Sequence, residues 1–256
     1  MNYLAITTCN AEQWEKHGRK MATTFYQNWP EEVPLFLYAE GFHDGSDVPN
    51  FMLDLDEEAP LLATFKATYN HPEHRGMVNS RYEYKLDAVK FAHKIAAIGA
   101  AAEECERGTL IWMDADIVTH APVTVAWLEA LFPPSSGAAL AWLDRTYKEA
   151  ECGFLMFRLP SALTIIRRLV KTYQDGSIFA LEQTHDSFVI QNVVDKARQR
   201  GEITVHSLSR DKASYRHPFI NSRLGECMDH LKGSRKEHGR SYEIDLKRPR
   251  PEVYWQ

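Results

Sequence analysis

Residues 110–118 read Leu-Ile-Trp-Met-Asp-Ala-Asp-Ile-Val, and this stretch is the most informative about the fold. The first four are apolar and, together with Thr109, predict a buried strand over 109–113. Two aspartates follow directly, one residue apart. Ligands of α/β proteins gather at the carboxyl ends of strands. Because residues i and i+2 of an extended chain point the same way, Asp114 and Asp116 are expected to face one point.

Two carboxylates that face one point repel each other unless a positive charge lies between them. A divalent cation with oxygen ligands removes that repulsion, so the pair predicts a metal site on Asp114 and Asp116. The structural alternative is that one aspartate caps the following turn while the other is solvated. The apolar strand that leads into the pair favours the metal site.

Strand and helix patterns alternate on both sides of this stretch. Apolar, β-branched runs predict further strands over 3–8, 34–39, 138–143, 152–159 and 203–206. Helical spacing of apolar residues predicts helices over 11–28, 81–104, 122–132, 161–173 and 186–199. The stretch 40–60, rich in Gly, Pro and Asp, predicts a loop. The alternation is typical of an α/β fold with a mostly parallel central sheet flanked by helices, and the second half is mixed.

Composition excludes several classes of protein. The chain has 256 residues, of which 44% are hydrophobic and 25% charged, and these ordinary globular values exclude a disordered tail or a coiled coil. No apolar run approaches the ~18–20 residues that cross a bilayer, and no secretory signal pattern is found, so a cytoplasmic protein is expected. The four cysteines form no C-x-x-C pair, which favours free thiols over a structural zinc site.

A second motif lies near the end of the chain. Residues 230–236 read His-Leu-Lys-Gly-Ser-Arg-Lys, in the form H-x-x-G-x-x-K. An imidazole added to two carboxylates shifts metal preference from Mg²⁺ toward Mn²⁺. Glycine adds no Cβ beside a bound group, and the lysine belongs to a basic stretch that suggests a site for one compact anion, such as a phosphate group. The alternative is a partly exposed His230 at a helix end and a solvated Lys236.

Taken together and in this order, the two motifs resemble those of family 8 glycosyltransferases, the glycogenin and lipopolysaccharide-galactosyltransferase type. The resemblance implies a GT-A (Rossmann-like) fold in which Asp114, Asp116 and His230 hold Mn²⁺ or Mg²⁺ against the diphosphate of a nucleotide sugar. It places Gly233 and Lys236 at the diphosphate. It also implies a UDP-sugar donor and retention of anomeric configuration. The family usually has Pro-Trp after the lysine, whereas Glu-His follows here.

The resemblance also divides the chain and places further residues. It implies one glycosyltransferase domain over 1–256, with a nucleotide-binding part over about 1–120 and a donor-sugar and acceptor part over about 121–256. Expected contacts to the nucleotide and its phosphates are Thr8, Asn10, Tyr38, Arg81 and Lys90, and expected catalytic contacts to the donor sugar are Glu151 and Asp186. Each has a structural alternative: a helix cap, a core ring, a solvated helix face or a polar residue that begins an element.

Other functions fit parts of the same pattern. Residues 114–118 also match D-x-D-x-[TV] of haloacid-dehalogenase-like phosphatases, in which Asp114 would be the nucleophile, but the later acidic pair of that class does not follow. A non-catalytic nucleotide-sugar-binding module would carry the same residues.

The acceptor is left open among saccharide, protein, lipid head group and nucleic acid. Residues 230–250 contain seven Lys or Arg against three Asp or Glu, which is compatible with a hydroxymethylated DNA base as acceptor, as in phage DNA glycosyltransferases. The net charge of −5 argues against bulk binding of a polyanion.

Overall fold

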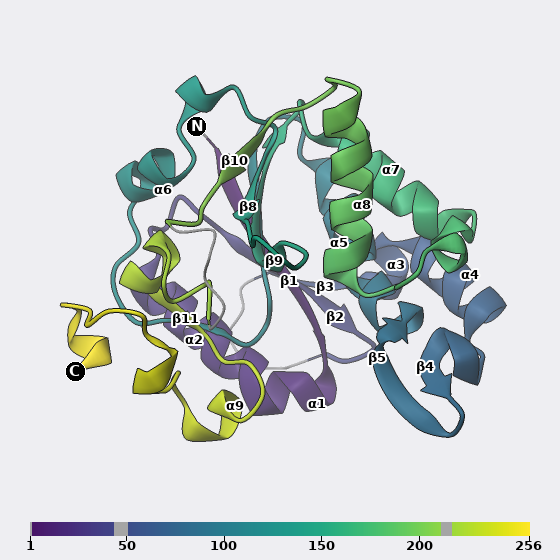
Figure 1. Ribbon diagram of the computed structural model, residues 1–256, viewed down its shortest axis with the longest axis horizontal. Coiled ribbons are helices and arrows are strands. Elements are labelled where there is room, and N and C mark those ends of the chain that lie inside the picture. The colour runs from purple at the N-terminus through teal and green to yellow at the C-terminus, as the bar shows by residue number, and fades with distance from the viewer. Residues whose placement is uncertain (1, 44–50, 211–216) are drawn as a thin grey trace.

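A seven-stranded sheet forms the centre of the protein, and both halves of the chain contribute strands to it (Figure 1). The computed structural model describes residues 2–43, 51–210 and 217–256. Across the sheet the strands are β10 (Val205–Ser207), β8 (Leu140–Leu143), β9 (Glu151–Leu159), β6 (Gly108–Met113), β1 (Tyr3–Asn10), β2 (Leu35–Glu40) and β3 (Phe51–Asp54). Strand β9 is antiparallel to β6 and β8, and the other neighbours are parallel. The predicted α/β sheet, mostly parallel and mixed in its second half, is confirmed.

Helices cover both faces of this sheet (Figure 1). One face carries α3 (Leu55–Glu58), α4 (Pro60–Tyr69), α5 (Ala88–Glu104), α7 (Leu163–Gln174) and α8 (Asp186–Gln199). The other carries α2 (Arg19–Asn28) and α6 (Val125–Leu131), and α1 (Ala11–Gln13) continues into α2 through the π-helical segment Trp14–Gly18. The core is split accordingly: Leu110 and Trp112 of β6 pack on the α5 side, and Ile111 and Met113 on the α2 side. This period of two on a strand buried on both faces is what its apolar run predicts.

The predicted helix over 81–104 is wrong in its first seven residues. These form β5 (Arg81–Asp87), which pairs with β4 (Arg75–Val78) in a hairpin. Asn79 and Ser80 both have positive φ, 49° and 62°, as a tight two-residue hairpin turn requires. The side chain of Asp87 then caps α5, so the helix begins only at Ala88.

The predicted loop over 40–60 is only partly correct. Strand β3 and helix α3 occupy residues 51–58, and residues 44–50 lie outside the described ranges. Asp54 explains the change from strand to helix, because its side chain accepts the backbone N–H groups of Asp56 and Glu57 and so caps α3.

A small antiparallel ribbon lies outside the central sheet. Strand β7 (Ile117–Thr119) pairs with β11 (Met228–His230), and His230 lies opposite Ile117. Neither strand is predicted from the sequence, because three residues are too few for a period-two pattern. The ribbon brings a segment from the end of the chain beside the acidic pair that follows β6.

Two general expectations can be compared with the structure. Within the described ranges, no helix combines the length and apolar character needed to cross a membrane. All four cysteines are free thiols, as expected: Cys9, Cys105, Cys152 and Cys227.

His120, the residue after β7, is expected to make the fold sensitive to acid. Burial lowers its pKa to about 4, although Asp229 and Glu252 oppose the shift. The unfolded chain takes up this proton near pH ~6.5. Between these pH values the unfolded state binds more protons, so the free energy of unfolding falls as the pH falls. His120→Phe, which keeps a ring against Tyr254, should therefore show a smaller loss of stability between pH 7 and pH 5 in urea denaturation. An equal loss in variant and wild type would contradict this expectation.

Candidate metal centre and the charged cluster around it

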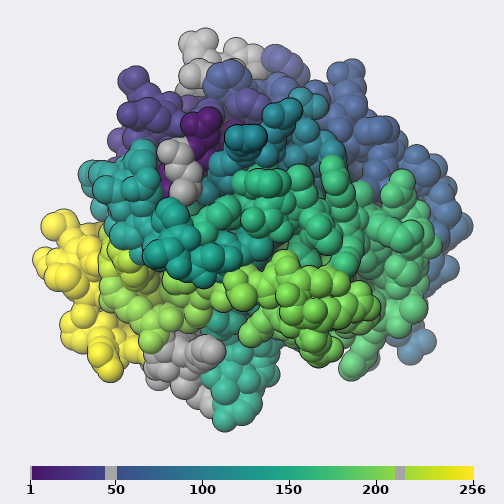
Figure 2. Space-filling view, turned by 90° about the horizontal axis from the view of Figure 1, so that it is seen from above, coloured from purple at the N-terminus to yellow at the C-terminus, as the bar shows by residue number. Residues whose placement is uncertain are grey.

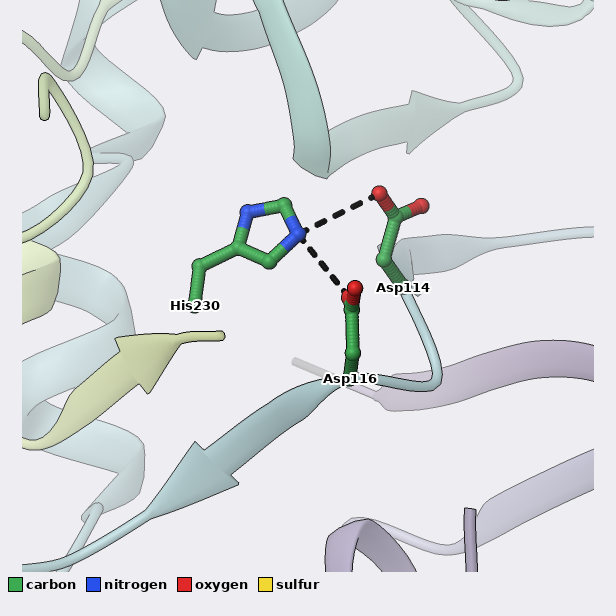
Figure 3. Close-up of side chains that lie close together, drawn as sticks. All are labelled: Asp114, Asp116 and His230. Atoms are coloured by element: carbon green, nitrogen blue, oxygen red, sulfur yellow. Dashed lines mark ion pairs between the residues drawn. The ribbon is translucent and has the colours of Figure 1, made fainter. Parts of the chain in front are cut away.

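Asp114 and Asp116 converge through a turn, not through an extended chain. The turn follows β6 directly, and the N–H of Ile117 donates to the carbonyl of Asp114 (3.0 Å). The N–H of Asp114 donates in turn to the carbonyl of Gly153 on β9 (2.8 Å). The expectation that the two carboxylates lie together is confirmed, but the i, i+2 alternation proposed as its cause is wrong. A backbone turn tied to β9 places both carboxylates beside His230 (Figure 3).

His230 completes a cluster of three potential ligands. Its Nε2 lies 2.9 Å from Asp116 Oδ1 and 3.5 Å from Asp114 Oδ2 (Figure 3). One ligand atom from each of the three residues lies within 4.8 Å of the others. The side chain of His230 is 1% exposed. Pairing of β11 with β7, and the bond from the N–H of Leu231 to the carbonyl of Asp116 (3.0 Å), fix it beside the turn.

The chemistry of this cluster fits a divalent cation. Among the described residues, both ring nitrogens of His230 and Asp116 Oδ1 are buried and form no well-aligned hydrogen bond, and their close contacts are ion pairs with carboxylates. Buried polar atoms are costly when they lack a partner. Two ligands at a right angle around an ion, each ~2.1 Å from it, would be ~3 Å apart. The 2.9 Å between Nε2 and Oδ1 matches that spacing.

Electrostatics favour a charged imidazole when no cation is bound. Burial alone would lower the pKa of His230, but the carboxylate of Asp116, with help from Glu151, raises it to about 9. Burial likewise opposes ionisation of Asp116, but His230 and Lys236 outweigh it and hold the pKa of that carboxyl well below its usual range. A divalent cation would displace the proton from His230 as it binds.

Strand β9 shapes the space behind His230. A Cβ at Gly153 would lie 2.2 Å from His230 Cε1, so no side chain fits at this position. Glu151, two residues earlier, is 5% exposed, and its Oε1 lies 3.5 Å from His230 Nδ1 and 2.5 Å from Lys232 Nζ. Glu151 was predicted to contact the donor sugar. The structure places its carboxylate against His230 and Lys232, where it can orient the imidazole, and the contact with the donor sugar stays a prediction.

Lys94, which is not among the predicted donor contacts, pairs with both Asp114 and Asp186. It is 7% exposed on α5; its Nζ lies 2.8 Å from Asp114 Oδ1, pairs with Asp186, and donates to the carbonyl of Cys152 (3.1 Å). Burial would lower the pKa of Lys94, but the two carboxylates outweigh it and raise the pKa. The signal was present in the sequence, because a lysine inside the apolar stretch 91–102 needs acidic partners.

Arg81 and Lys90, the two basic residues predicted at the donor, lie outside this cluster. Arg81 is exposed on β5, because the predicted helix does not include it. Lys90 is exposed on α5, four residues before Lys94, which corresponds to ~6 Å along the helix axis. In the described part of the chain, neither forms an ion pair with Asp114, Asp116 or Asp186.

Of the three residues predicted at the ends of the first two strands, Thr8 and Asn10 are half-buried and Tyr38 is buried. The hydroxyl of Thr8 donates to the carbonyl of Tyr38 (2.6 Å). Asn10 caps α1, accepting the N–H of Gln13 (2.9 Å). A role for Thr8 and Asn10 at the nucleotide stays a prediction. Tyr38 is 1% exposed and packs in the core on the α5 side, so its ring is not presented to a base.

The H-x-x-G-x-x-K motif folds back onto the acidic pair. Lys236, on the short helix α9 (Arg235–His238), places Nζ 2.9 Å from Asp116 Oδ2. Gly233 has φ of +59°, a left-handed conformation that favours glycine, and a Cβ there would meet open space. The structure therefore brings Lys236 to a candidate metal ligand, while its predicted contact with a phosphate stays a prediction.

No protein-family model and no curated protein matches this chain. Several solved structures show a weak likeness to it. Mouse xyloside xylosyltransferase 1, in its apo form, aligns over 82% of this chain and 86% of its own, with a TM-score of 0.47 and 10% identity. A glycosyltransferase involved in the glycosylation of the major capsid of PBCV-1 aligns over 93% and 98%, with a TM-score of 0.48 and 9% identity. The galactosyltransferase LgtC, in complex with donor and acceptor sugar analogues, aligns over 90% and 87%, with a TM-score of 0.49 and 8% identity.

Proposed function

We propose that this protein is a metal-dependent glycosyltransferase that moves a sugar from a nucleotide diphosphate donor, a UDP-sugar, to an acceptor. The observation that carries the proposal is the convergence of Asp114, Asp116 and His230 at the carboxyl end of β6. These three side chains would hold Mn²⁺ in preference to Mg²⁺, because an imidazole joins the two carboxylates. When bound, the cation supplies Lewis-acid neutralisation of the departing diphosphate.

Lys236 is assigned to the diphosphate of the donor. Its ammonium contacts the carboxylate of Asp116, one of the three candidate ligands, and its side chain is 33% exposed. When the carboxylate of Asp116 binds a cation, its ion pair with Lys236 weakens. The ammonium of Lys236 can then offset the negative charge of the leaving nucleotide. Gly233, three residues earlier, leaves open space in which a phosphate can approach the backbone.

Asp186 is assigned to the donor sugar. It begins α8, and the buried ammonium of Lys94 helps to hold its pKa below the usual range against the effect of burial. A carboxylate that stays ionised in a buried position can stabilise the oxocarbenium-like state through which glycosyl transfer passes. Glu151 is assigned to orientation of His230, because its carboxylate lies on that imidazole and on Lys232. Retention of configuration stays a prediction from the family resemblance.

A thermal-shift screen of nucleotide sugars tests the donor. A ligand at a hundred times its Kd stabilises the folded state by about 2.7 kcal/mol, which for a chain of this length corresponds to a rise in Tm of roughly 5–10 °C. We expect this rise for a UDP-sugar together with Mn²⁺, and a smaller one for either alone. Equal shifts with and without Mn²⁺ for every nucleotide sugar would contradict a metal-bridged donor.

Donor hydrolysis separates the alternatives. A glycosyltransferase releases UDP slowly without an acceptor, a binding module releases none, and a phosphatase of the haloacid-dehalogenase type hydrolyses simple phosphate esters and is trapped by beryllofluoride. The phosphatase would need Asp114 free to attack, but its Oδ1 accepts the indole N–H of Trp112 (2.8 Å) and lies as close to Lys94. A cytoplasmic location and the choice among saccharide, protein and modified DNA as acceptor stay predictions.

A further inference from the structure

Strand β11, which ends at His230, is supported from the side opposite the candidate metal centre. The β7–β11 ribbon has three residues in each strand, and an isolated ribbon this short is marginally stable. Successive residues of a strand point to opposite sides, so His230 faces Asp116 while Asp229 faces away. Asp229 is nevertheless fully buried, at 0% exposed.

The carboxylate of Asp229 is bound by the C-terminal segment, residues 240–256. The backbone N–H of Ser241 and the hydroxyl of Tyr254 donate to Oδ2 at 2.7 and 3.0 Å. The hydroxyl of Ser241 donates to Oδ1 at 2.7 Å. These three hydrogen bonds satisfy both oxygens of a fully buried carboxyl group, so they anchor β11 to the C-terminal segment.

Tyr254 reaches both strands of the ribbon. Its ring stacks on the imidazole of His120, with centroids 4.0 Å apart and planes 6° from parallel, and His120 follows β7 directly. Its hydroxyl reaches Asp229 on β11. Asp116 immediately precedes β7 and His230 ends β11, so Tyr254 ties together the two elements that carry these ligands. The C-terminal segment lies at one end of the molecule (Figure 2).

We propose that Tyr254, acting through Asp229, is a positioning residue for the metal centre. It touches neither Asp116 nor His230, but it fixes the ribbon that sets the spacing between them. Groups that hydrogen-bond a metal ligand directly change metal affinity by about 10- to 100-fold, and for Tyr254, one contact further from the ligands, we expect the lower end of that range. The inference rests on the proposed function, because it assumes that Asp114, Asp116 and His230 bind a cation.

The test compares Mn²⁺ affinity in matched variants, by electron paramagnetic resonance titration of free Mn²⁺ at a temperature where all are folded. Tyr254→Phe keeps the ring on His120 and removes only the hydroxyl, and it should raise the Kd for Mn²⁺ about tenfold. Trp255→Phe removes the indole N–H bond to the carbonyl of Gly225 (2.9 Å) but keeps an aromatic ring beside His120 and Tyr254, and it should leave the Kd unchanged.

A double-variant cycle then identifies the contact. Asp229→Asn alters the same contact from its other end, so the Tyr254→Phe/Asp229→Asn protein should bind Mn²⁺ no more weakly than Asp229→Asn alone. Additive losses, equal weakening in Trp255→Phe, or wild-type affinity in Tyr254→Phe would each overturn the positioning role. A wild-type protein that binds no Mn²⁺ would overturn the proposed function as well, which distinguishes the two failures.

Discussion

Asp114→Asn is expected to lose nucleotide-sugar turnover by roughly 10³-fold or more while its fold persists. The amide keeps an oxygen that can accept the indole N–H of Trp112, but the candidate centre loses one of its two negative charges. One carboxylate and one imidazole bind a cation more weakly than two carboxylates and an imidazole do. Less of the enzyme then carries the cation that neutralises the leaving diphosphate. Release of UDP from UDP-sugars, at a Mn²⁺ concentration that saturates the wild type, measures the loss, and circular dichroism checks the fold.

Asp144 provides a matched control for this substitution. It follows β8 as Asp114 follows β6, and it also accepts the indole N–H of the tryptophan two residues earlier, Trp142 (2.6 Å). Asp144 does not belong to the cluster of potential ligands found among the described residues. Asp144→Asn should therefore bind Mn²⁺ like the wild type. Wild-type UDP release by Asp114→Asn would contradict the assignment of Asp114 to the metal.

Lys94→Met is expected to have the largest effect on stability, a loss of about 3–5 kcal/mol in the free energy of unfolding. The variant removes the ammonium that neutralises Asp186 and lies on Asp114, and Asp186 is only 9% exposed. A buried carboxylate without its partner must be protonated or solvated, and both cost free energy. Urea denaturation monitored by tryptophan fluorescence gives the difference.

Two further variants test the reason for that loss. Lys90→Met, on the exposed surface of the same helix, should change stability by less than about 0.5 kcal/mol. Lys94→Met combined with Asp186→Asn should recover part of the loss, because the second change removes the uncompensated charge. A double variant that is less stable than Lys94→Met would show that packing around the lysine, not charge, sets its contribution.

Local patterns were enough to predict the central part of the site. The apolar run into Asp114 marked a strand buried on both faces, and the acidic pair marked its carboxyl end. His230 could be joined to that pair only through the family resemblance, because nothing local indicates that residues more than a hundred positions apart meet. The physical link is the β7–β11 ribbon, whose strands are too short to leave a pattern.

The sequence was less informative where tertiary packing decides the outcome. Helical spacing could not show that residues 81–87 form a strand, because the strand depends on pairing with β4 across a turn in which Asn79 and Ser80 have positive φ. Whether Lys90 or Lys94 pairs with the acidic residues depends on which side of α5 faces Asp114 and Asp186, and the sequence does not show this. Glu151 and Gly153 act on His230 from β9, a relation that depends on the antiparallel pairing of β9 with β6.

Anomalous diffraction from crystals of this protein grown with Mn²⁺ and UDP tests the central claim most directly. We expect one strong peak at bonding distance, ~2.2 Å, from side-chain atoms of Asp114, Asp116 and His230, with the diphosphate on its open side. A peak bound by other residues, or UDP bound in full with no metal between it and these three side chains, would contradict this claim.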